Sequence, residues 1–266
     1  MVAAGIDIGS RTIGFVLLDS ASGELLHHDL IDSGYDPIAR ARDHVAQFDY
    51  DQIVATGYGR HAANNNFGAE VITEIKAYAR GARYVLPDVR TILDIGGQDT
   101  KSITLDENGA VNEFQMNEKC AAGTGKFMEV MAVTLGYSMD EFAAAPLQAV
   151  DKTLKISSMC AVFAESEVVS LLNSGCPRAD VANAVIDSVA QRAAGMLRRN
   201  GIYGSVMFAG GGAHNRCLRD KVSALIGFDM QVPSQPQLIG AIGAACEARR
   251  VFKQRKPSAE KCVVNL

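Results

Sequence analysis

One segment of the chain occurs twice, and this duplication limits the possible folds more than any other feature. The segment DIGSRTIGFVLLD at residues 7–19 aligns without gaps with DIGGQDTKSITLD at residues 94–106, an offset of 87 residues. In each copy a β-rich stretch leads into Asp-Ile-Gly, and a second stretch, a small turn and a third strand-like segment follow. The small turns are Ser22-Gly23 and Asn108-Gly109. The two copies therefore predict one β-meander used twice.

Helical periodicity occupies much of the remaining chain. Apolar residues recur at three- and four-residue spacing in residues 36–48, 72–86, 126–135, 164–172, 181–198, 217–226 and 238–252. Further short strands are predicted at residues 52–56, 90–94, 205–209 and 230–232. Together these elements predict a two-lobed α/β fold, with a first lobe of residues 1–87 and a second lobe of residues 88–236. The last helix, residues 237–253, is expected to return to the first lobe, and the polar tail after Lys253 is expected to fray.

Composition excludes several classes of protein. The chain has 266 residues, 48% of them hydrophobic, and a net charge of -4, which excludes disorder and the basic surface of a nucleic-acid-binding protein. The N-terminus lacks the pattern of a signal peptide, and no apolar run is long enough to span a membrane. Six cysteines are too few for a disulfide scaffold of this size. We therefore expect a cytoplasmic protein with no nucleic-acid or membrane partner.

Three glycine turns are candidates for phosphate binding. Gly9 follows Asp7 at the end of a predicted strand, with the hydroxyls of Ser10 and Thr12 beside it, and Gly96 and Gly97 repeat the arrangement after Asp94. The third turn, residues 208–215, links a strand to a helix, whose N-terminus favours anions. Taken alone, each glycine turn is a weak signal that a simple tight turn explains, and a turn cap explains each aspartate. The combination predicts two facing hairpins whose carboxylates hold the waters of Mg²⁺.

This combination resembles the actin, Hsp70 and sugar-kinase superfamily of ATPases. The resemblance implies that ATP or ADP binds, and that Asp7 and Asp94 organise Mg²⁺. It further implies phosphate contacts from Ser10, Thr12, Gly96, Gly97 and Gln98, and a nucleoside border made by Gly211, Gly212, Asn215 and Gln237. Many relatives have Lys where Gly14 stands, so Arg11 is a candidate replacement. Gln98 and Asp99 both remain candidates for orienting the attacking water.

Two cysteines precede predicted helices. Cys120 lies in NEKCAAGTGKF and Cys160 in SSMCAVFAESE, and a helix N-terminus favours the thiolate needed for metal binding or redox chemistry. The alternative is that each is a small buried residue. Cys217 and Cys246 fit helix cores, Cys176 precedes a proline, and Cys262 belongs to the tail. A cubane iron–sulfur cluster generally takes four cysteines, which two chains would supply.

The segments NEKCAAGTGKFMEVMA and SSMCAVFAESEVVS are similar to signature segments of the 2-hydroxyacyl-CoA dehydratase activators, or component A proteins, of the BadF/BadG/BcrA/BcrD ATPase family. The resemblance runs from about Gly5 to Ala248. It implies a homodimer in which Cys120 and Cys160 of both subunits hold one oxygen-sensitive [4Fe-4S] cluster, as expected of an anaerobic metabolism. It also implies reduction by ferredoxin or flavodoxin and ATP-driven electron transfer to a partner iron–sulfur enzyme. That partner is a dehydratase, a benzoyl-CoA reductase or a double-cubane cluster protein.

Two other functions are compatible with the superfamily. A small-molecule kinase would need a substrate pocket with a general base, and no segment indicates one. A non-catalytic actin-like protein would polymerise and be colourless. The charged residues near the cysteines, among them Glu165 and Glu167, are expected on a solvated helix face, and His214 is expected to be a polar loop residue.

Overall fold

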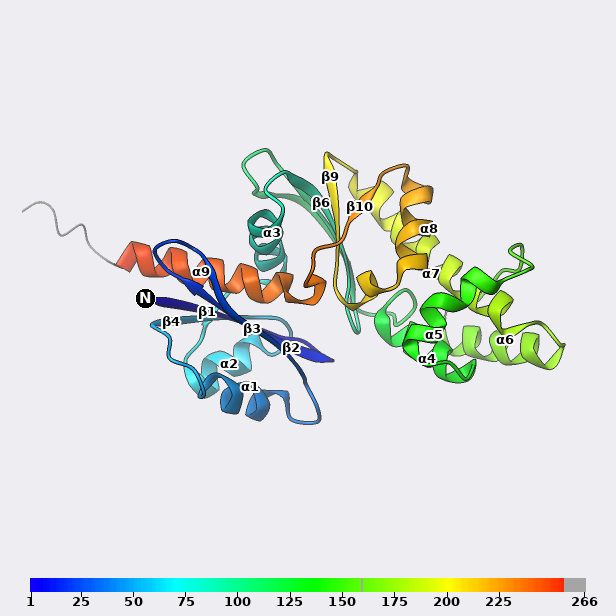
Figure 1. Cartoon of the computed structure of the whole chain (residues 1–266), viewed down its shortest axis with the longest axis horizontal. Helices are drawn as coiled ribbons and strands as arrows, with labels where there is room; N and C mark the ends of the chain where they lie inside the picture. The colour runs from blue at the N-terminus through cyan, green and yellow to red at the C-terminus, as the bar shows by residue number, and fades with distance from the viewer. Residues whose placement is uncertain (159, 256–266) are drawn as a thin grey trace, which may run out of the picture. The chain divides into compact units, whose positions relative to one another are not determined.

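The computed structural model describes residues 1–158 and 160–255, which form two compact units (Figure 1). Of the described residues, the first unit contains 1–84 and 238–255, and the second unit is Val85–Gln237. Most of the predicted tail, including Cys262, lies outside the described residues. Within the described part of the chain, no helix has both the length and the apolar character needed to cross a bilayer.

The first unit is built on a five-stranded sheet of order β3-β2-β1-β4-β5. The strands are β1 Val2–Ile8, β2 Thr12–Asp19, β3 Leu25–Asp32, β4 Gln52–Thr56 and β5 Glu70–Val71. β1, β2 and β3 form an antiparallel meander, whereas β4 pairs with β1 in parallel and β5 pairs with β4 in parallel. The strands β1 and β2 are almost fully buried, because helices cover both faces of the sheet.

Two hydrophobic clusters of this unit lie on opposite faces of β1. Its helices are α1 Pro37–Val45, α2 Arg60–Phe67, α3 Glu74–Val85 and α9 Ile239–Arg255. Ile6 and Ile8 pack with α1 and α2, whereas Ala3 packs with α3 and α9, as the alternation of strand side chains requires. At Gly5 a Cβ atom would overlap the backbone of α9, so glycine permits the helix to lie directly on the strand.

The second unit repeats the topology of the first, with a sheet of order β10-β9-β6-β7-β8. The strands are β6 Val89–Ile95, β7 Thr100–Leu105, β8 Val111–Asn117, β9 Ser205–Ala209 and β10 Met230–Gln231. β6, β7 and β8 form the antiparallel meander, and β9 pairs with β6 in parallel. The register repeats as well, since Asp7 lies opposite Gly14 and Asp94 lies opposite Lys101. The predicted duplication is confirmed.

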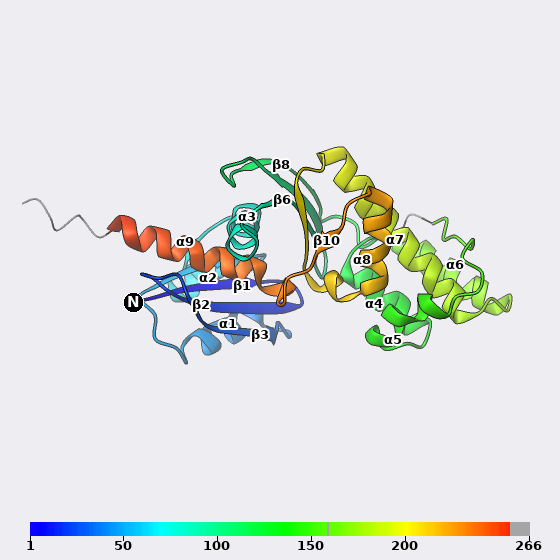
Figure 2. The same cartoon turned by 45° about the horizontal axis from the view of Figure 1, so that its top comes forward.

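The helices of the second unit share one hydrophobic core with its sheet. They are α4 Gly125–Thr134, α5 Met139–Ala144, the 3₁₀ turn η1 Ala145–Gln148, α6 Ala161–Asn173, α7 Arg178–Asn200, η2 Gly211–His214, α8 Arg216–Ile226 and η3 Pro236–Leu238, the last residue of which begins the returning chain of the first unit. Figure 2 shows α4, α5 and α6 gathered beside one end of α7. Phe127 of α4, Ala164 of α6 and Val185 of α7 belong to the same core, together with Leu93 of β6.

Most predicted elements occur, but the helices α2 and α5 and the two-residue strand β5 were not predicted. The strands at residues 52–56 and 205–209 match the prediction to the residue. α2 was not predicted because its sequence, RHAANNNF, has one buried residue, Ala63, and therefore no apolar stripe. α5 has only six residues and escapes a periodicity test, although Ser138 caps it with a capping box. At the C-terminal end, α9 continues to Arg255, two residues beyond the predicted limit.

Candidate nucleotide turns and thiol sites

The first glycine turn is closed by its own backbone. The Gly9 N–H donates to the Thr12 carbonyl at 3.0 Å, and Ser33 Oγ donates to the Gly9 carbonyl at 2.8 Å. Ser10 and Arg11 are exposed at the tip, whereas Asp7 is buried at the end of β1. The turn therefore presents a hydroxyl and a guanidinium next to a buried carboxylate.

The second glycine turn has the same closure. The Gly96 N–H donates to the Asp99 carbonyl at 3.0 Å, at the positions that Gly9 and Thr12 take in the first copy. Gly96 and Gly97 are partly exposed, and Gln98 is exposed at the tip. A Cβ atom at position 96 would overlap the Asp99 carboxylate, which would then have to shift.

A buried lysine distinguishes the second turn from the first. Lys101 is 1% exposed, and its Nζ lies 3.1 Å from Asp94 Oδ2 and 2.6 Å from Asp99 Oδ2. A buried ammonium at hydrogen-bond distance from two carboxylates offsets part of their negative charge and fixes their positions. Gly14, which lies opposite Asp7 in the first copy, has no side chain to do the same. Sequence reasoning missed Lys101, whose role depends on the register between β6 and β7.

The third turn gathers four residues predicted at the nucleoside. Gly210 has φ of 80°, and its N–H donates to the Pro236 carbonyl at 2.8 Å, which brings Gln237 to the turn. His214 Nε2 lies 3.0 Å from Gln237 Oε1. Gly211 and Gly212 form the start of η2 beside them. Asn215 is buried and caps α8 by accepting from the Leu218 N–H at 2.9 Å, a structural role that its sequence context did not reveal.

A fourth glycine turn, which the sequence analysis missed, follows β4. Gly57 has φ of 82°, and a Cβ atom there would overlap the Asp7 carboxylate. Gly210 has the same relation to Asp94 after β9, where a Cβ atom would lie 2.5 Å from Asp94 Oδ1. Two residues further on, a Cβ atom at Gly59 would likewise overlap Ile8, and one at Gly212 would overlap Ile95. The visible signal was the Gly-x-Gly pattern after each strand, and each unit therefore carries two glycine turns.

Cys120 is exposed, but the helix-terminus argument made for it is wrong. The helix α4 begins at Gly125 with Thr124 as its N-cap, so Cys120 lies five residues before the first helical residue. The loop is held instead by Asn117, whose Nδ2 donates to the Cys120 carbonyl at 2.9 Å. The helix dipole acts within the first turn only, and therefore does not reach this thiol.

Cys160 fits the prediction, since it is exposed and is the N-cap residue of α6. The segment before it is fixed by Glu167, which accepts from the Ser157 and Ser158 N–H groups, both at 2.9 Å. Burial opposes ionisation of Glu167, but these hydrogen bonds outweigh it and lower its pKa. Glu167 is partly exposed on α6, as expected, and in addition it holds the segment before Cys160.

Arg192 of α7 contacts the segments that carry both thiols. Its Nη2 lies 3.5 Å from the Ser158 carbonyl, and its Cδ would lie 3.4 Å from a Cβ atom at Gly123. The helices that follow, α4 and α6, pack against each other, and Thr134 Oγ1 donates to Glu165 Oε1 at 3.4 Å. The two segments are therefore neighbours in one unit. Among the described residues, no set of three or more His, Cys, Asp or Glu side chains is arranged to hold a metal ion.

The remaining described cysteines differ from these two. Cys217 is buried in α8, and burial raises its pKa. Cys246 lies in α9, where burial raises its pKa to about 11, so it stays a thiol at neutral pH. Cys176 is partly exposed before Pro177.

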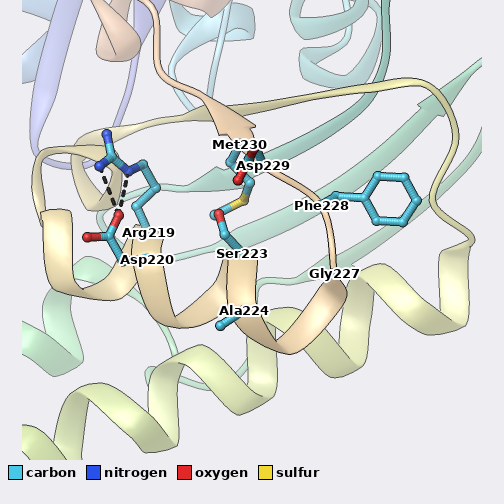
Figure 3. A pocket seen from close by; sticks show the side chains of 8 residues that line it. All are labelled: Arg219, Asp220, Ser223, Ala224, Gly227, Phe228, Asp229 and Met230. Carbon is cyan, nitrogen blue, oxygen red and sulfur yellow. Dashed lines mark hydrogen bonds and ion pairs between the residues drawn. The ribbon is translucent and has the colours of Figure 1, made fainter.

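A surface pocket of the second unit is lined by residues other than the predicted site residues. It has a volume of about 640 Å³ and lies between α8 and the segment that leads into β10 (Figure 3). Its eight lining residues are Arg219, Asp220, Ser223, Ala224, Gly227, Phe228, Asp229 and Met230. Figure 3 shows Arg219 paired with Asp220 at one side of this pocket. None of the eight is a predicted site residue.

The duplicated sheets with their glycine turns define an actin-like ATPase fold of the kind that sugar kinases share. A ROK family glucokinase from Streptomyces griseus has this fold, with a TM-score of 0.58 and 15% identity over 94% of this chain and 100% of that chain. The sequence profile of the BadF/BadG/BcrA/BcrD ATPase family matches residues 4–248. The chain belongs to this family.

Activators of dehydratases are among the most similar proteins. The activator of lactoyl-CoA dehydratase from Anaerotignum propionicum is 41% identical over 96% of this chain and 100% of its own length. The activator of the 2-hydroxyisocaproyl-CoA dehydratase from Clostridium difficile, solved with bound ADPNP, has a TM-score of 0.86 and 35% identity over 97% and 99% of the two chains. Component A of the Acidaminococcus fermentans (R)-2-hydroxyglutaryl-CoA dehydratase has a TM-score of 0.88 and 34% identity over 95% and 99%.

Proposed function

We propose that the protein is an ATP-dependent electron-transfer activator. Two copies of the chain form a homodimer that holds one [4Fe-4S] cluster through Cys120 and Cys160 of each copy. ATP hydrolysis drives the delivery of one low-potential electron to a partner iron–sulfur dehydratase or reductase. Membership of an ATPase family, and the similarity to dehydratase activators, support the proposal.

The observation that carries this proposal is the pair of exposed thiols on neighbouring segments of the second unit. Cysteine thiolates are the usual ligands of a cubane cluster, which takes four of them. Each chain supplies two, so a second copy completes the set. Val162 and Phe163, which follow Cys160, are 67% and 68% exposed, and such apolar side chains fit a surface that another chain covers.

The glycine turns are proposed to bind the nucleotide. Ser10, Arg11 and Thr12 in the first unit, and Gly96, Gly97 and Gln98 in the second, bind the phosphates through N–H groups and polar side chains. Asp7 and Asp94 bind the waters of Mg²⁺ through their carboxylate oxygens, the ligand type that this ion prefers. Lys101 holds the Asp94 carboxylate in place at the end of β6.

The same ion pair separates the two candidates for orienting the attacking water. Asp99 Oδ2 is engaged by Lys101 at 2.6 Å, so this oxygen is already occupied by a side-chain partner. Gln98 is exposed at the tip of the turn and is free to orient water. Gly211, Gly212 and Gln237 border the nucleoside, and Asn215 acts indirectly by capping α8.

The electron comes from a reduced ferredoxin or flavodoxin in the cytoplasm. The cluster supplies a one-electron carrier of low potential. ATP and ADP must favour different shapes of the dimer, because only a difference in binding shifts a conformational equilibrium. Cleavage of ATP by water to ADP and phosphate then makes transfer to the partner effectively irreversible.

Anaerobic purification with iron, sulfide and ATPase assays tests the proposal. We expect a brown dimer with one cubane cluster per two chains and ATPase activity. An iron-free preparation that phosphorylates a small molecule would contradict the proposal, and so would a colourless preparation that polymerises.

A further inference from the structure

The start of α4 is hydrogen-bonded to the second glycine turn. The Gly125 N–H donates to the Gly96 carbonyl at 2.8 Å, and the Lys126 N–H donates to the Gly97 carbonyl at 2.8 Å. The first N–H groups of a helix have no acceptor within the helix, and here the turn supplies acceptors. A Cβ atom at Gly125 would lie 2.9 Å from the Gly96 carbonyl oxygen, so glycine is what permits this contact.

Peptide geometry links this contact to the opposite side of the turn. The Gly96 carbonyl belongs to the same planar trans peptide group as the Gly97 N–H, and the Gly97 carbonyl to the same group as the Gln98 N–H. In a trans peptide the two bonds point in opposite directions. Because the carbonyls point at α4, the N–H groups of Gly97 and Gln98 point away from α4. An anion bound by these N–H groups would polarise the same peptides and strengthen their bonds to α4.

Thr100 fixes the loop that carries the thiol, residues 118–124, here called the Cys120 loop. Thr100 is the first residue of β7 and is 4% exposed, and its Oγ1 donates to the Gly123 carbonyl at 2.8 Å. It pairs in register with Asn117, the last residue of β8, whose Nδ2 donates to the Cys120 carbonyl. Two adjacent strand positions therefore hold the two ends of the loop.

We propose that Thr100 is the positioning residue that transmits occupancy of the second glycine turn to the Cys120 loop. A shift of the Gly96 and Gly97 peptides moves the start of α4. The Thr100 hydroxyl keeps Gly123, two residues before α4, attached to β7, the strand that follows this turn directly. The loop then follows the turn as one body. The inference rests on the proposed function, because it requires nucleotide phosphate at the turn.

Hydrogen–deuterium exchange of the anaerobically purified full chain, with and without MgADP, tests this role. In the wild type, MgADP should slow exchange of the Gly125 and Lys126 amides by about fivefold, the effect of one strengthened hydrogen bond. Exchange in the Cys120 loop should slow with them. Thr100→Val removes the hydroxyl at nearly constant shape and should abolish the response of the loop alone. Thr100→Ser keeps the hydroxyl and should restore it.

Measurements of ADP affinity and iron content distinguish this role from a merely structural one. Thr100→Val and Thr100→Ser should have ADP affinities within twofold of each other by calorimetry, and iron contents that are unchanged. A Thr100→Val protein whose Cys120 loop still responds to MgADP like the wild type would overturn the inference. If the Thr100→Val protein is globally unfolded, the Thr100→Ser protein decides the outcome. A Thr100→Ser protein whose loop does not respond to MgADP would then overturn the inference.

Failure of the proposed function would give a different pattern. If calorimetry shows no nucleotide binding to the wild type, the proposed function fails and this inference fails with it. If nucleotide binds but exchange of residues 118–126 is unchanged in the wild type, this inference alone fails. If exchange responds as expected in a preparation without iron, the coupling stands and the assignment of the cluster fails.

Discussion

Each unit has its own sheet, and the two sheets have the same topology but carry different insertions. The same strand order and the same Asp-to-turn register occur twice. Between the third and fourth strands, the first unit has residues 33–51 with α1, whereas the second has residues 118–204 with α4, α5, α6 and α7. Cys120 and Cys160 both lie in the longer insertion. The duplicated sheet provides glycine turns in both halves, and one insertion gives a single half its exposed thiols.

A second difference lies inside the sheets themselves. At the position opposite the strand-end aspartate, the first unit has Gly14 and the second has Lys101. The second carboxylate therefore has a buried cation that the register of the first sheet does not provide. Equivalent positions in a duplicated fold need not carry equivalent charge.

The largest effect is expected from removing the exposed thiols that set the second unit apart. Cys120→Ser and Cys160→Ser should each reduce the iron content of the anaerobically purified protein to background, because oxygen is a poor replacement for a thiolate ligand. Cys176→Ser, which alters a partly exposed thiol of the same unit, is the matched control and should keep its iron. Iron retained by the Cys120 variant would refute the ligand assignment.

Lys101→Met should give the next largest effect, because it leaves two carboxylates without their buried cation. Removing one partner of a buried ion pair should lower the free energy of unfolding by about 4 kcal/mol in urea denaturation. Lys126→Met is the control, because Lys126 is 48% exposed in its ion pair with Glu129 and should lose less than about 1 kcal/mol. Equal losses in the two variants would contradict the role of Lys101.

Alanine substitutions test whether the glycine turns of the two units are equivalent. Gly57→Ala and Gly210→Ala should each lower the free energy of unfolding by about 3 kcal/mol, from positive φ combined with overlap with an aspartate. Gly175→Ala adds a Cβ at φ of 88° with no atom within 4 Å, so it should cost only about 1 kcal/mol. A large loss at one turn and none at the other would show that the two turns are not structurally equivalent.

The smallest expected effect concerns the insertion. The hydrogen bonds to Glu167 lower its pKa in the folded state, so they stabilise the fold above the unfolded pKa of about 4.3. This stabilisation is lost as the pH falls through the lowered value. Glu167→Gln should therefore cost about 1 kcal/mol at pH 7 and less near pH 3 by thermal unfolding. Glu165→Gln should be neutral at both, and a pH-independent loss for Glu167→Gln would contradict the pKa shift.

Much of the fold could be predicted from the sequence because it follows from local patterns. The repeat of Asp7 at Asp94 and the alternation of apolar residues indicate both meanders. α2 could not be predicted, because its formation depends on packing of Ala63 under the sheet and not on an apolar stripe. Gly57 was missed as a turn because its Gly-x-Gly pattern is common in loops.

The candidate site could be predicted less completely, because side-chain partners depend on register and on distant segments. The pairing of Lys101 with Asp94 requires that β6 and β7 align as they do. Glu167 reaches back to Ser157 across a loop that no local rule places. Cys120 was assigned to a helix start, but the helix begins only after the turn closed by Thr124, whose N–H and hydroxyl both donate to the Ala121 carbonyl.

Native mass spectrometry of the anaerobically purified protein addresses the shared cluster most directly. We predict a species with the mass of two chains and one Fe₄S₄ cluster, which separates into cluster-free single chains when both Cys120 and Cys160 are replaced by Ser. A wild-type protein that is iron-free, or a single chain that carries a complete cluster, would contradict the proposal.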